Sequence, residues 1–263
     1  MFGKKSIVVC VPHGLLMDAW FVDETGNTKN VPDVSFQTLR SHYHVSRVRL
    51  LLSEDDTYIK LLLFPKGTRI TRVQVIQQAT EVIPEDIEDG FMDWKEISFE
   101  QDRIGVQLYV VKKAVLAPLL TLAADAKITI ESCEPPSSAM ARMVNQPHIP
   151  CFIVYPKDKP LYCAAVFEHS VLEVMSIDSL QSCTDYIKKQ WGITIKTTVS
   201  SPPDPVLGLA AKTDITGTDA DTLNIPSNQK IEHPHSAKAA LISFFIVLFF
   251  IEVIGSGIWL WKK

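Results

Sequence analysis

Apolar and polar positions along the chain follow two periods, and these periods predict the order of strands and helices. SIVVCVPHGLLMDAWFVDETG, residues 6–26, contains two apolar runs around a turn and predicts a β-hairpin. Residues 27–46 are polar and predict an irregular connection. RVRLLLSEDDTYIKLLLFP, residues 47–65, repeats the hairpin pattern with Ser-Glu-Asp-Asp at its tip. Between Thr71 and Ile83 the apolar positions have helical spacing, and Pro84 predicts the end of that helix.

The later segments alternate in the same way between strand and helix patterns. They predict a hairpin at 91–112, a helix at 113–126, a strand at 127–135, a short helix at 137–144, a long hairpin at 150–177, a helix at 177–191, a strand at 193–199 and a closing helix at 205–212. Hairpins open both halves of this region, and helices and strands alternate after each. The pattern therefore predicts a mixed α/β fold in which the order of an RNase H-like half occurs twice.

The C-terminal part of the chain has a different composition. Residues 213–238 are polar and aperiodic, which is typical of a linker. Residues 239–261 are apolar apart from Glu252, and about 20 such residues cross a bilayer as a helix. Lysines flank this run on both sides, at 230 and 238 and at 262 and 263, so the positive-inside rule does not orient it. With no export signal and no paired cysteines, we expect a single-pass protein of the inner membrane whose N-terminal domain, residues 1–212, faces the cytoplasm.

Composition narrows the possible functions. The 263 residues are 46% hydrophobic, enough for a large core, and the net charge of −4 gives no basic surface for nucleic acid. The five cysteines form no C-x-x-C pair, which favours reduced, buried thiols over disulfides or a metal site.

No pattern of catalytic or metal-ligating residues stands out. Glu85, Asp86, Glu88 and Asp89 directly follow a helix-ending proline and favour a solvated turn over an acid–base pair. The pairs His42/His44 and His233/His235 have no third spaced ligand. The sequence also lacks G-x-S-x-G, Walker A and G-x-G-x-x-G motifs. We therefore predict no catalytic residue, no metal and no cofactor.

The order of several short motifs resembles a known family. Leu63-Phe64-Pro65 precedes a helix that ends at Ile83-Pro84, Asp93 enters the next strand, and Glu134-Pro135 leads into a helix through Ala139. This run, clearest over residues 47–145, resembles the PilM proteins of type IV pilus assembly and the cytoplasmic part of the related GspL proteins of type II secretion. The resemblance implies an actin-like, two-lobed α/β fold with a shortened second half and a small inserted subdomain at about 65–110.

The resemblance also implies where a nucleotide would bind, and the sequence departs from the family there. The first phosphate hairpin of an actin-like ATPase needs small residues and an acid, but this chain has Pro12, His13 and Gly14. The second has Lys157, Asp158 and Lys159 between two prolines that lack a backbone donor. We expect that nucleotide binding is lost, so that the chain is not an enzyme.

The remaining expectations concern partners. Leu223, Asn224, Ile225 and Pro226 are similar to the short PilN peptide that PilM proteins bind, and a chance tetrapeptide in a linker is the alternative. Within the predicted membrane helix, small residues follow the only charge on one face, which favours a second helix there. That face comprises Leu248, Glu252, Gly255, Ser256 and Trp259.

The resemblance implies a membrane-anchored scaffold that links a motor ATPase to PilN/PilO-like or GspM-like inner-membrane proteins, with a homodimer as a further possibility. Two other functions stay open at this point: an actin-like ATPase with unconventional phosphate loops, and an unrelated tail-anchored adaptor.

Overall fold

The computed structural model describes residues 6–83, 90–100, 102–146, 148–155, 161–176, 179–199, 202–211 and 223–224. These residues belong to one compact unit, Met1–Ile225. The acidic turn at 85–89 and residues 239–261 lie outside the described residues, as does the linker at 213–238 apart from 223–224. No helix among the described residues is long and apolar enough to cross a membrane.

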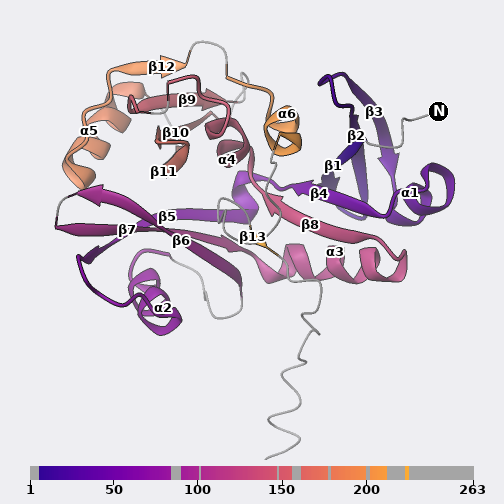
Figure 1. The fold of residues 1–263 in the computed structure, drawn as a ribbon, viewed down its shortest axis with the longest axis horizontal. Coiled ribbons are helices and arrows are strands. Elements are labelled where there is room, and N and C mark those ends of the chain that lie inside the picture. The colour runs from indigo at the N-terminus through magenta and orange to yellow at the C-terminus, as the bar shows by residue number, and fades with distance from the viewer. Residues whose placement is uncertain are drawn as a thin grey trace, which may run out of the picture. The chain divides into compact units, whose positions relative to one another are not determined.

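A six-stranded sheet forms the first half of the fold (Figure 1). Its order is β13-β8-β4-β1-β2-β3. The strands β1 (Ile7–His13), β2 (Leu16–Val22) and β3 (Thr28–Val34) form an antiparallel meander. β4 (Arg47–Leu51) and β8 (Thr129–Glu134) then add in parallel beside β1. A meander followed by parallel strands is the RNase H-like order that the sequence predicted.

Helices cover both faces of this sheet around its central strands β1, β4 and β8, which are mostly buried. α1 (Phe36–Tyr43) and α3 (Lys113–Asp125) bury Phe36, Leu39 and Leu116 against one face. α6 (Pro205–Ala210) covers the other face near Val9 and Leu51. Figure 1 shows α3 lying along β8.

A seven-stranded sheet with the order β12-β9-β10-β11-β5-β7-β6 forms the rest of the fold. β9 (Cys151–Tyr155), β10 (Tyr162–Phe167) and β11 (Ser170–Ser176) form a second meander, and β12 (Thr197–Val199) pairs in parallel with β9. α5 (Leu180–Trp191) packs Cys183 and Ile187 on one face of this meander. Within the described residues, this part of the sheet has four strands besides β5, β7 and β6, and the first half has five besides β13. The shortening of the second half stays a prediction.

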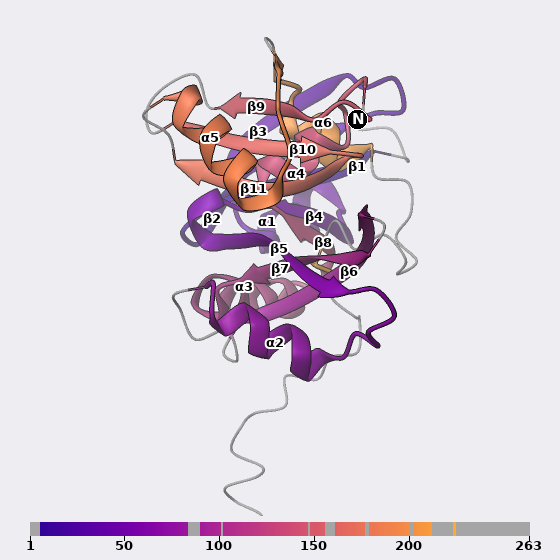
Figure 2. The ribbon, with the colours of Figure 1, turned by 90° about the vertical axis from the view of Figure 1, so that its left-hand side faces the viewer.

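Residues of the predicted insertion lie at the far end of this second sheet (Figure 2). β5 (Thr57–Pro65), β6 (Phe91–Glu100) and β7 (Arg103–Val111) pair antiparallel, and α2 (Arg72–Thr80) packs Val75 and Ala79 against them. β5 meets the second meander at a single residue pair, Glu173 with Lys60, whose side chains also form an ion pair. Buried side chains of β5 and β7 also pack on this meander, among them Ile59 and Leu61, and Gln107 of β7 donates to the carbonyl of Val171 at 2.7 Å. The inserted subdomain stays a prediction.

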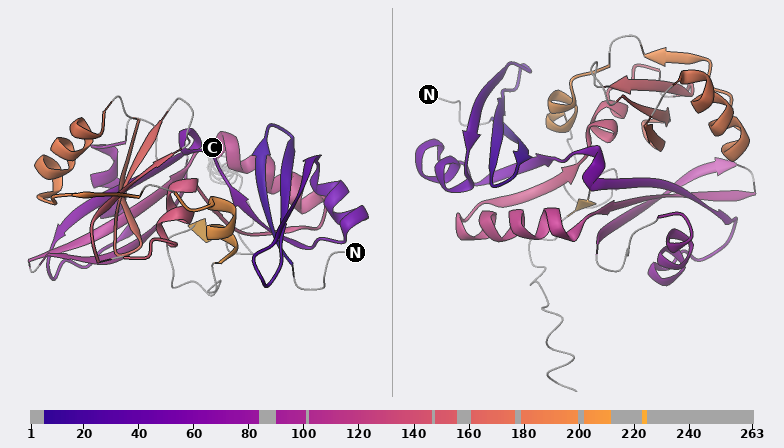
Figure 3. Two further views of the ribbon diagram at one scale, coloured as in Figure 1. Left: turned by 90° about the horizontal axis from the view of Figure 1, so that it is seen from above. Right: turned by 180° about the vertical axis from the view of Figure 1, so that it is seen from behind.

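Two short helices lie between the two halves (Figure 3, left). α4 (Pro136–Ala141) follows β8 and packs on β9 and β11, and α6 packs against α4. Gly208 of α6 permits this close approach, because a Cβ atom there would lie 2.2 Å from the carbonyl oxygen of Ala139.

Three local predictions from the pattern are wrong. Residues 27–46 are not irregular but form β3 and α1, with Ser35 as N-cap accepting a hydrogen bond from the Thr38 backbone. Residues 47–65 are not a hairpin, because β4 and β5 belong to different sheets. Residues 150–177 form three strands rather than two, since Glu168 and His169 take positive φ values of 48° and 61° and make an extra tight turn.

Candidate functional site

The turn between β1 and β2 occupies the position at which the resemblance places a phosphate hairpin. His13 pairs with Leu16, so the turn consists of Gly14 and Leu15. Gly14 has a φ of 77°, a conformation that glycine adopts without strain and that opens a type II′ turn. Pro12 contributes no backbone N–H, and the side chain of Leu15 is 72% exposed. The tip of the turn is therefore apolar, and β1 lacks one backbone donor two positions before it.

The other predicted contact residues lie mostly outside the described residues. Lys157, Asp158 and Lys159 of the second hairpin are among them. The same holds for Ile225 and Pro226 and for the membrane-helix face of Leu248, Glu252, Gly255, Ser256 and Trp259.

Leu223 and Asn224 are described, and they form the short strand β13 at the edge of the first sheet. β13 runs antiparallel to β8, with Leu223 opposite Cys133 and Asn224 opposite Ser132. An extended segment that adds to an exposed sheet edge is a common mode of peptide recognition. In the described residues, this chain's own Leu223 and Asn224 occupy the edge of β8.

Two arginines hold α6 between the halves of the fold. Arg142 donates to both carboxylate oxygens of Glu134, at 2.7 and 3.0 Å, and to the carbonyl of Gly208 at 2.9 Å. Arg49 donates to the carbonyls of Leu209 and Ala210, at 2.8 and 3.1 Å. The last carbonyls of a helix have no partner within the helix. These bonds therefore supply donors to the C-terminal carbonyls of α6 and hold α6 in place. The segment that leads to the linker is therefore anchored in the domain.

Glu54 connects three elements close to α4. It follows β4, accepts hydrogen bonds from the backbone N–H of Ser137 at 2.7 Å and from the Tyr155 hydroxyl at 2.7 Å, and also contacts the Ser137 hydroxyl. Burial raises the pKa of the Glu54 carboxyl, and the bonds from Tyr155 and Ser137 oppose that rise only in part. The same environment raises the pKa of the Tyr155 hydroxyl. This polar contact joins the first half, α4 and β9.

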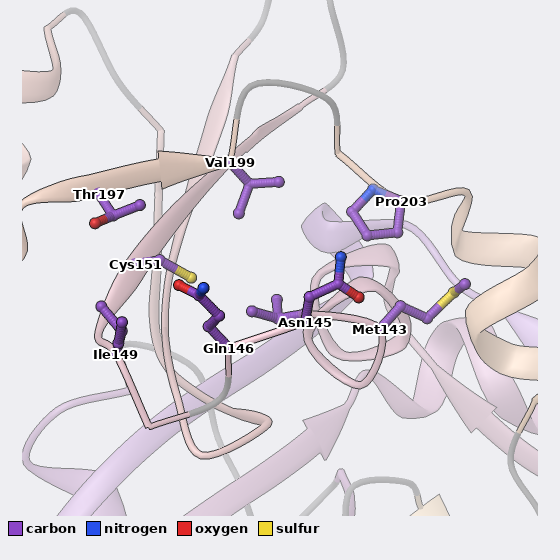
Figure 4. Close-up of a pocket in the computed structure, with 9 residues that line it drawn as sticks. Met143, Asn145, Gln146, Ile149, Cys151, Thr197, Val199 and Pro203 are labelled. Carbon is purple, nitrogen blue, oxygen red and sulfur yellow. The ribbon is translucent and has the colours of Figure 1, made fainter.

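A cavity of about 310 Å³ lies between the end of α4 and strands β9 and β12 (Figure 4). Its lining is mainly apolar, with two amides and the thiol of Cys151 among Met143, Val144, Asn145, Gln146, Ile149, Cys151, Thr197, Val199 and Pro203. Burial raises the pKa of Cys151, which keeps the thiol protonated and a poor nucleophile. The cavity has the size of a small-molecule site, but none of its described residues forms a catalytic arrangement.

The sequence did not reveal Arg49, Arg142 or Glu54 as key residues. Each is a charged residue whose partners are between 8 and 161 positions away, so no local spacing identifies it. The one signal was Glu134-Pro135 before a short helix, which marked the place of α4.

Comparisons with known proteins place this fold. A scan against protein-family models found no match, and neither did a search of curated proteins. Among solved structures, the cytoplasmic domain of EpsL, an inner-membrane component of the type II secretion system of Vibrio cholerae, matches with a TM-score of 0.54 and 12% identity. The match covers 78% of this chain and 93% of that domain.

Two further solved structures match at lower scores. A PilM–PilN type IV pilus biogenesis complex has a TM-score of 0.47 and 13% identity, covering 72% of this chain and 67% of that one. A Bacteroides thetaiotaomicron protein with an actin-like ATPase fold has a TM-score of 0.42 and 8% identity, covering 76% and 84%. At the level of the fold, the predicted resemblance to PilM and GspL proteins is confirmed.

Proposed function

We propose that this chain is a membrane-anchored cytoplasmic scaffold of a type IV pilus or type II secretion-like assembly platform. The observation that carries the proposal is the shared fold with the EpsL cytoplasmic domain, which extends over 93% of that domain. In this proposal residues 1–212 bind the assembly motor ATPase, and residues 239–261 hold the domain at the inner membrane beside PilN/PilO-like or GspM-like partners.

A domain-exchange experiment tests the scaffold. The full chain and a variant whose residues 239–261 are replaced by an unrelated membrane helix are crosslinked in native membranes, and the partners are identified by mass spectrometry. We expect both to retain a cytoplasmic ATPase, and only the native chain to retain membrane partners that depend on its own helix. If neither chain captures an assembly ATPase or an inner-membrane platform protein, the proposal is wrong.

The scaffold is proposed to work without a nucleotide. Support comes from the β1–β2 hairpin, where Pro12 near the end of β1 has no N–H and Leu15 in the turn has an exposed apolar side chain. Calorimetry of the full chain with Mg-ATP should give no heat of binding. A dissociation constant below about 100 µM, roughly −5.5 kcal/mol, would instead favour an ATPase with unconventional phosphate loops.

We also propose that Leu223, Asn224, Ile225 and Pro226 dock in cis on the edge of β8. The pairing of Leu223 with Cys133 supports this register and suggests a direct test. Residues directly opposite in an antiparallel pair lie about 4.5–5.5 Å apart at Cα, which is within the range that a disulfide bridges. Leu223→Cys should therefore crosslink to the native Cys133 under mild oxidation.

Asn224→Cys is the matched control for this experiment, because its opposite residue is Ser132 and no thiol is in register. Crosslinking of Leu223→Cys alone, within one chain, supports docking in cis. Crosslinks between two chains support docking in trans, and equal or absent crosslinking of both variants contradicts the register.

A further inference from the structure

Three side chains of the kinds that bind metals meet beside the β1–β2 turn. The Nε2 atom of His13 lies 3.2 Å from Oδ1 of Asp18 and 3.7 Å from Oδ1 of Asp33. The three ligand atoms all lie within 4.8 Å of one another. The cluster is separate from the contacts of Glu54, Arg49 and Arg142 and from the β8 edge.

The sheet brings these residues together from three successive strands. His13 ends β1, Asp18 lies in β2 and Asp33 lies in β3. The β2–β3 pairing shifts between Met17 and Ala19, and Asp33 opposite this irregularity has a φ of 54°. Such a bulge redirects a side chain. The backbone N–H of Asp33 also donates to Oδ1 of Asp18 at 3.3 Å, which holds the two residues together.

The distances fit the coordination shell of a small divalent ion. Bonds of about 2.0–2.1 Å from Zn²⁺ to nitrogen and oxygen ligands separate tetrahedral ligands by about 3.3 Å. The observed 3.2 and 3.7 Å lie on either side of this value, so small side-chain movements close the shell. One imidazole with two carboxylates suits Zn²⁺, Mn²⁺ or Fe²⁺, whereas Ca²⁺ and Mg²⁺ prefer all-oxygen sites.

The charge and the exposure of these side chains also favour a bound cation. Two carboxylates that converge on one point repel each other unless a cation lies between them. The side chains of His13, Asp18 and Asp33 are 42%, 37% and 73% exposed, so an ion reaches them from solvent and water can fill the remaining positions. We propose that His13, Asp18 and Asp33 bind one divalent transition-metal ion, with Zn²⁺ as the representative, at the tip of the first meander.

A nearby aspartate provides a matched control. Asp23 lies in the turn after β2, and its oxygens already accept hydrogen bonds from Thr25 and Asn27. These bonds lower the pKa of the Asp23 carboxyl to about 2. Asp23 is thus an exposed carboxylate of the same sheet whose acceptor positions are used, and Asp23→Asn should not affect the metal.

The test is a titration of the full chain in detergent micelles with Co²⁺, followed by visible absorption and by competition with Zn²⁺. We expect one equivalent to bind with a spectrum of nitrogen and oxygen ligands, without the charge-transfer band that a thiolate adds. His13→Ala should abolish this equivalent, and Asp18→Asn and Asp33→Asn should weaken it at least tenfold. Asparagine suits position 33 because it tolerates a positive φ.

Several outcomes contradict the proposal. If neither Co²⁺ nor Zn²⁺ binds, the proposal is wrong, and His13 simply contacts the two aspartates as an ion pair. Binding that none of the three variants changes belongs to other residues, and equal loss in Asp23→Asn shows a nonspecific effect of surface charge. Circular dichroism of each variant confirms that a lost equivalent does not reflect unfolding.

Discussion

At the residue scale, the buried carboxylate of Glu134 depends on Arg142. Glu134 is fully buried, and Arg142 supplies two hydrogen bonds to it besides one to α6. Removing one partner leaves a buried charge without compensation, so Arg142→Ala should lower the free energy of unfolding by about 3–5 kcal/mol. Urea unfolding followed by tryptophan fluorescence measures this change.

Arg47→Ala is the control for Arg142→Ala. Arg47 also forms an ion pair, with Glu131 at 3.5 Å, but its side chain is 73% exposed. An exposed pair contributes little, and the expected loss is below about 1 kcal/mol. Similar effects of the two substitutions would contradict the assigned role of Arg142.

The buried contact of Glu54 predicts a pH dependence. Because its pKa is raised, the folded state keeps the Glu54 proton over a pH range in which the unfolded state has lost it. The associated stability is fully present below the usual glutamate pKa of 4.5 and is lost as pH rises through the raised pKa. The urea midpoint should therefore fall as pH rises above 4.5, and Glu54→Gln should reduce that fall.

Glu173 contributes in the same direction, because burial also raises the pKa of its carboxyl. Glu54→Gln should accordingly remove only part of the fall. The exposed Glu81 provides a control, and Glu81→Gln should leave the pH profile unchanged. A profile that rises with pH in the native chain would contradict the assignment.

At this scale, the sequence predicts a residue's role when that role depends on its near neighbours in the chain, and not when it depends on contacts between distant segments. The turn between the first two apolar runs is readable from the local sequence, and the structure confirms it, with Gly14 at a φ of 77°. The pairing of Arg49 with carbonyls 160 and 161 positions away depends on how the halves of the chain meet. The cluster of His13, Asp18 and Asp33 depends on a bulge, which no spacing pattern marks.

At the scale of elements, the spacing of apolar residues predicted helices and strands correctly where an element buries one apolar face. The predicted helices at 71–83 and 113–126 correspond to α2 and α3, and the predicted hairpin at 91–112 corresponds to β6 and β7. The pattern did not predict the strand β3, because its exposed, polar residues show no alternation of apolar and polar positions. The pattern did not predict the helix α1, because the helix is short and its fully buried residues are only Phe36 and Leu39.

The turn between β10 and β11 provides a prediction at this scale. Glu168 and His169 both have positive φ without being glycine, a conformation that costs free energy in an ordinary residue. Asparagine adopts it more readily, and Glu168 loses only an exposed contact with His148 at 3.7 Å. Glu168→Asn should therefore raise the free energy of unfolding by about 0.5–1 kcal/mol in urea titrations.

The matched comparison is Glu168→Val, since a β-branched residue tolerates positive φ poorly. This substitution should destabilise the chain, although it removes the same carboxylate. If both variants change stability equally, loss of the His148 contact rather than backbone conformation explains the effect.

At the scale of the whole molecule, the order of elements predicted more than their individual lengths did. Two hairpins, each followed by alternating helices and strands, indicated two related halves. In the structure each hairpin opens a three-stranded meander, and a parallel strand joins each meander. The sequence did not reveal which sheet each strand joins. β4 and β5 are separated only by a short turn capped by Ser53, yet β5 joins the sheet of the second meander.

The last prediction concerns residues 239–261, whose role in the membrane stays a prediction from the sequence. Glu252 is the only charge in this run, and a carboxylate near the bilayer centre costs about 2.5–3.5 kcal/mol when ionised. Gly255 and Ser256 follow three and four positions later, which places them on the same face of the predicted helix, where small residues let a second helix approach. Such a helix would offer Glu252 a hydrogen-bond partner, which offsets the cost.

Cysteine scanning of residues 246–259 in native membranes tests this contact. Crosslinks should recur every three to four positions and be strongest on the face of Leu248, Glu252, Gly255, Ser256 and Trp259. Glu252→Leu should weaken them, because it removes the polar partner while preserving a helix that stays apolar. Glu252→Gln, which keeps hydrogen bonding without the charge, should retain them. Uniform crosslinking along the scan would instead mean that these residues only anchor the domain.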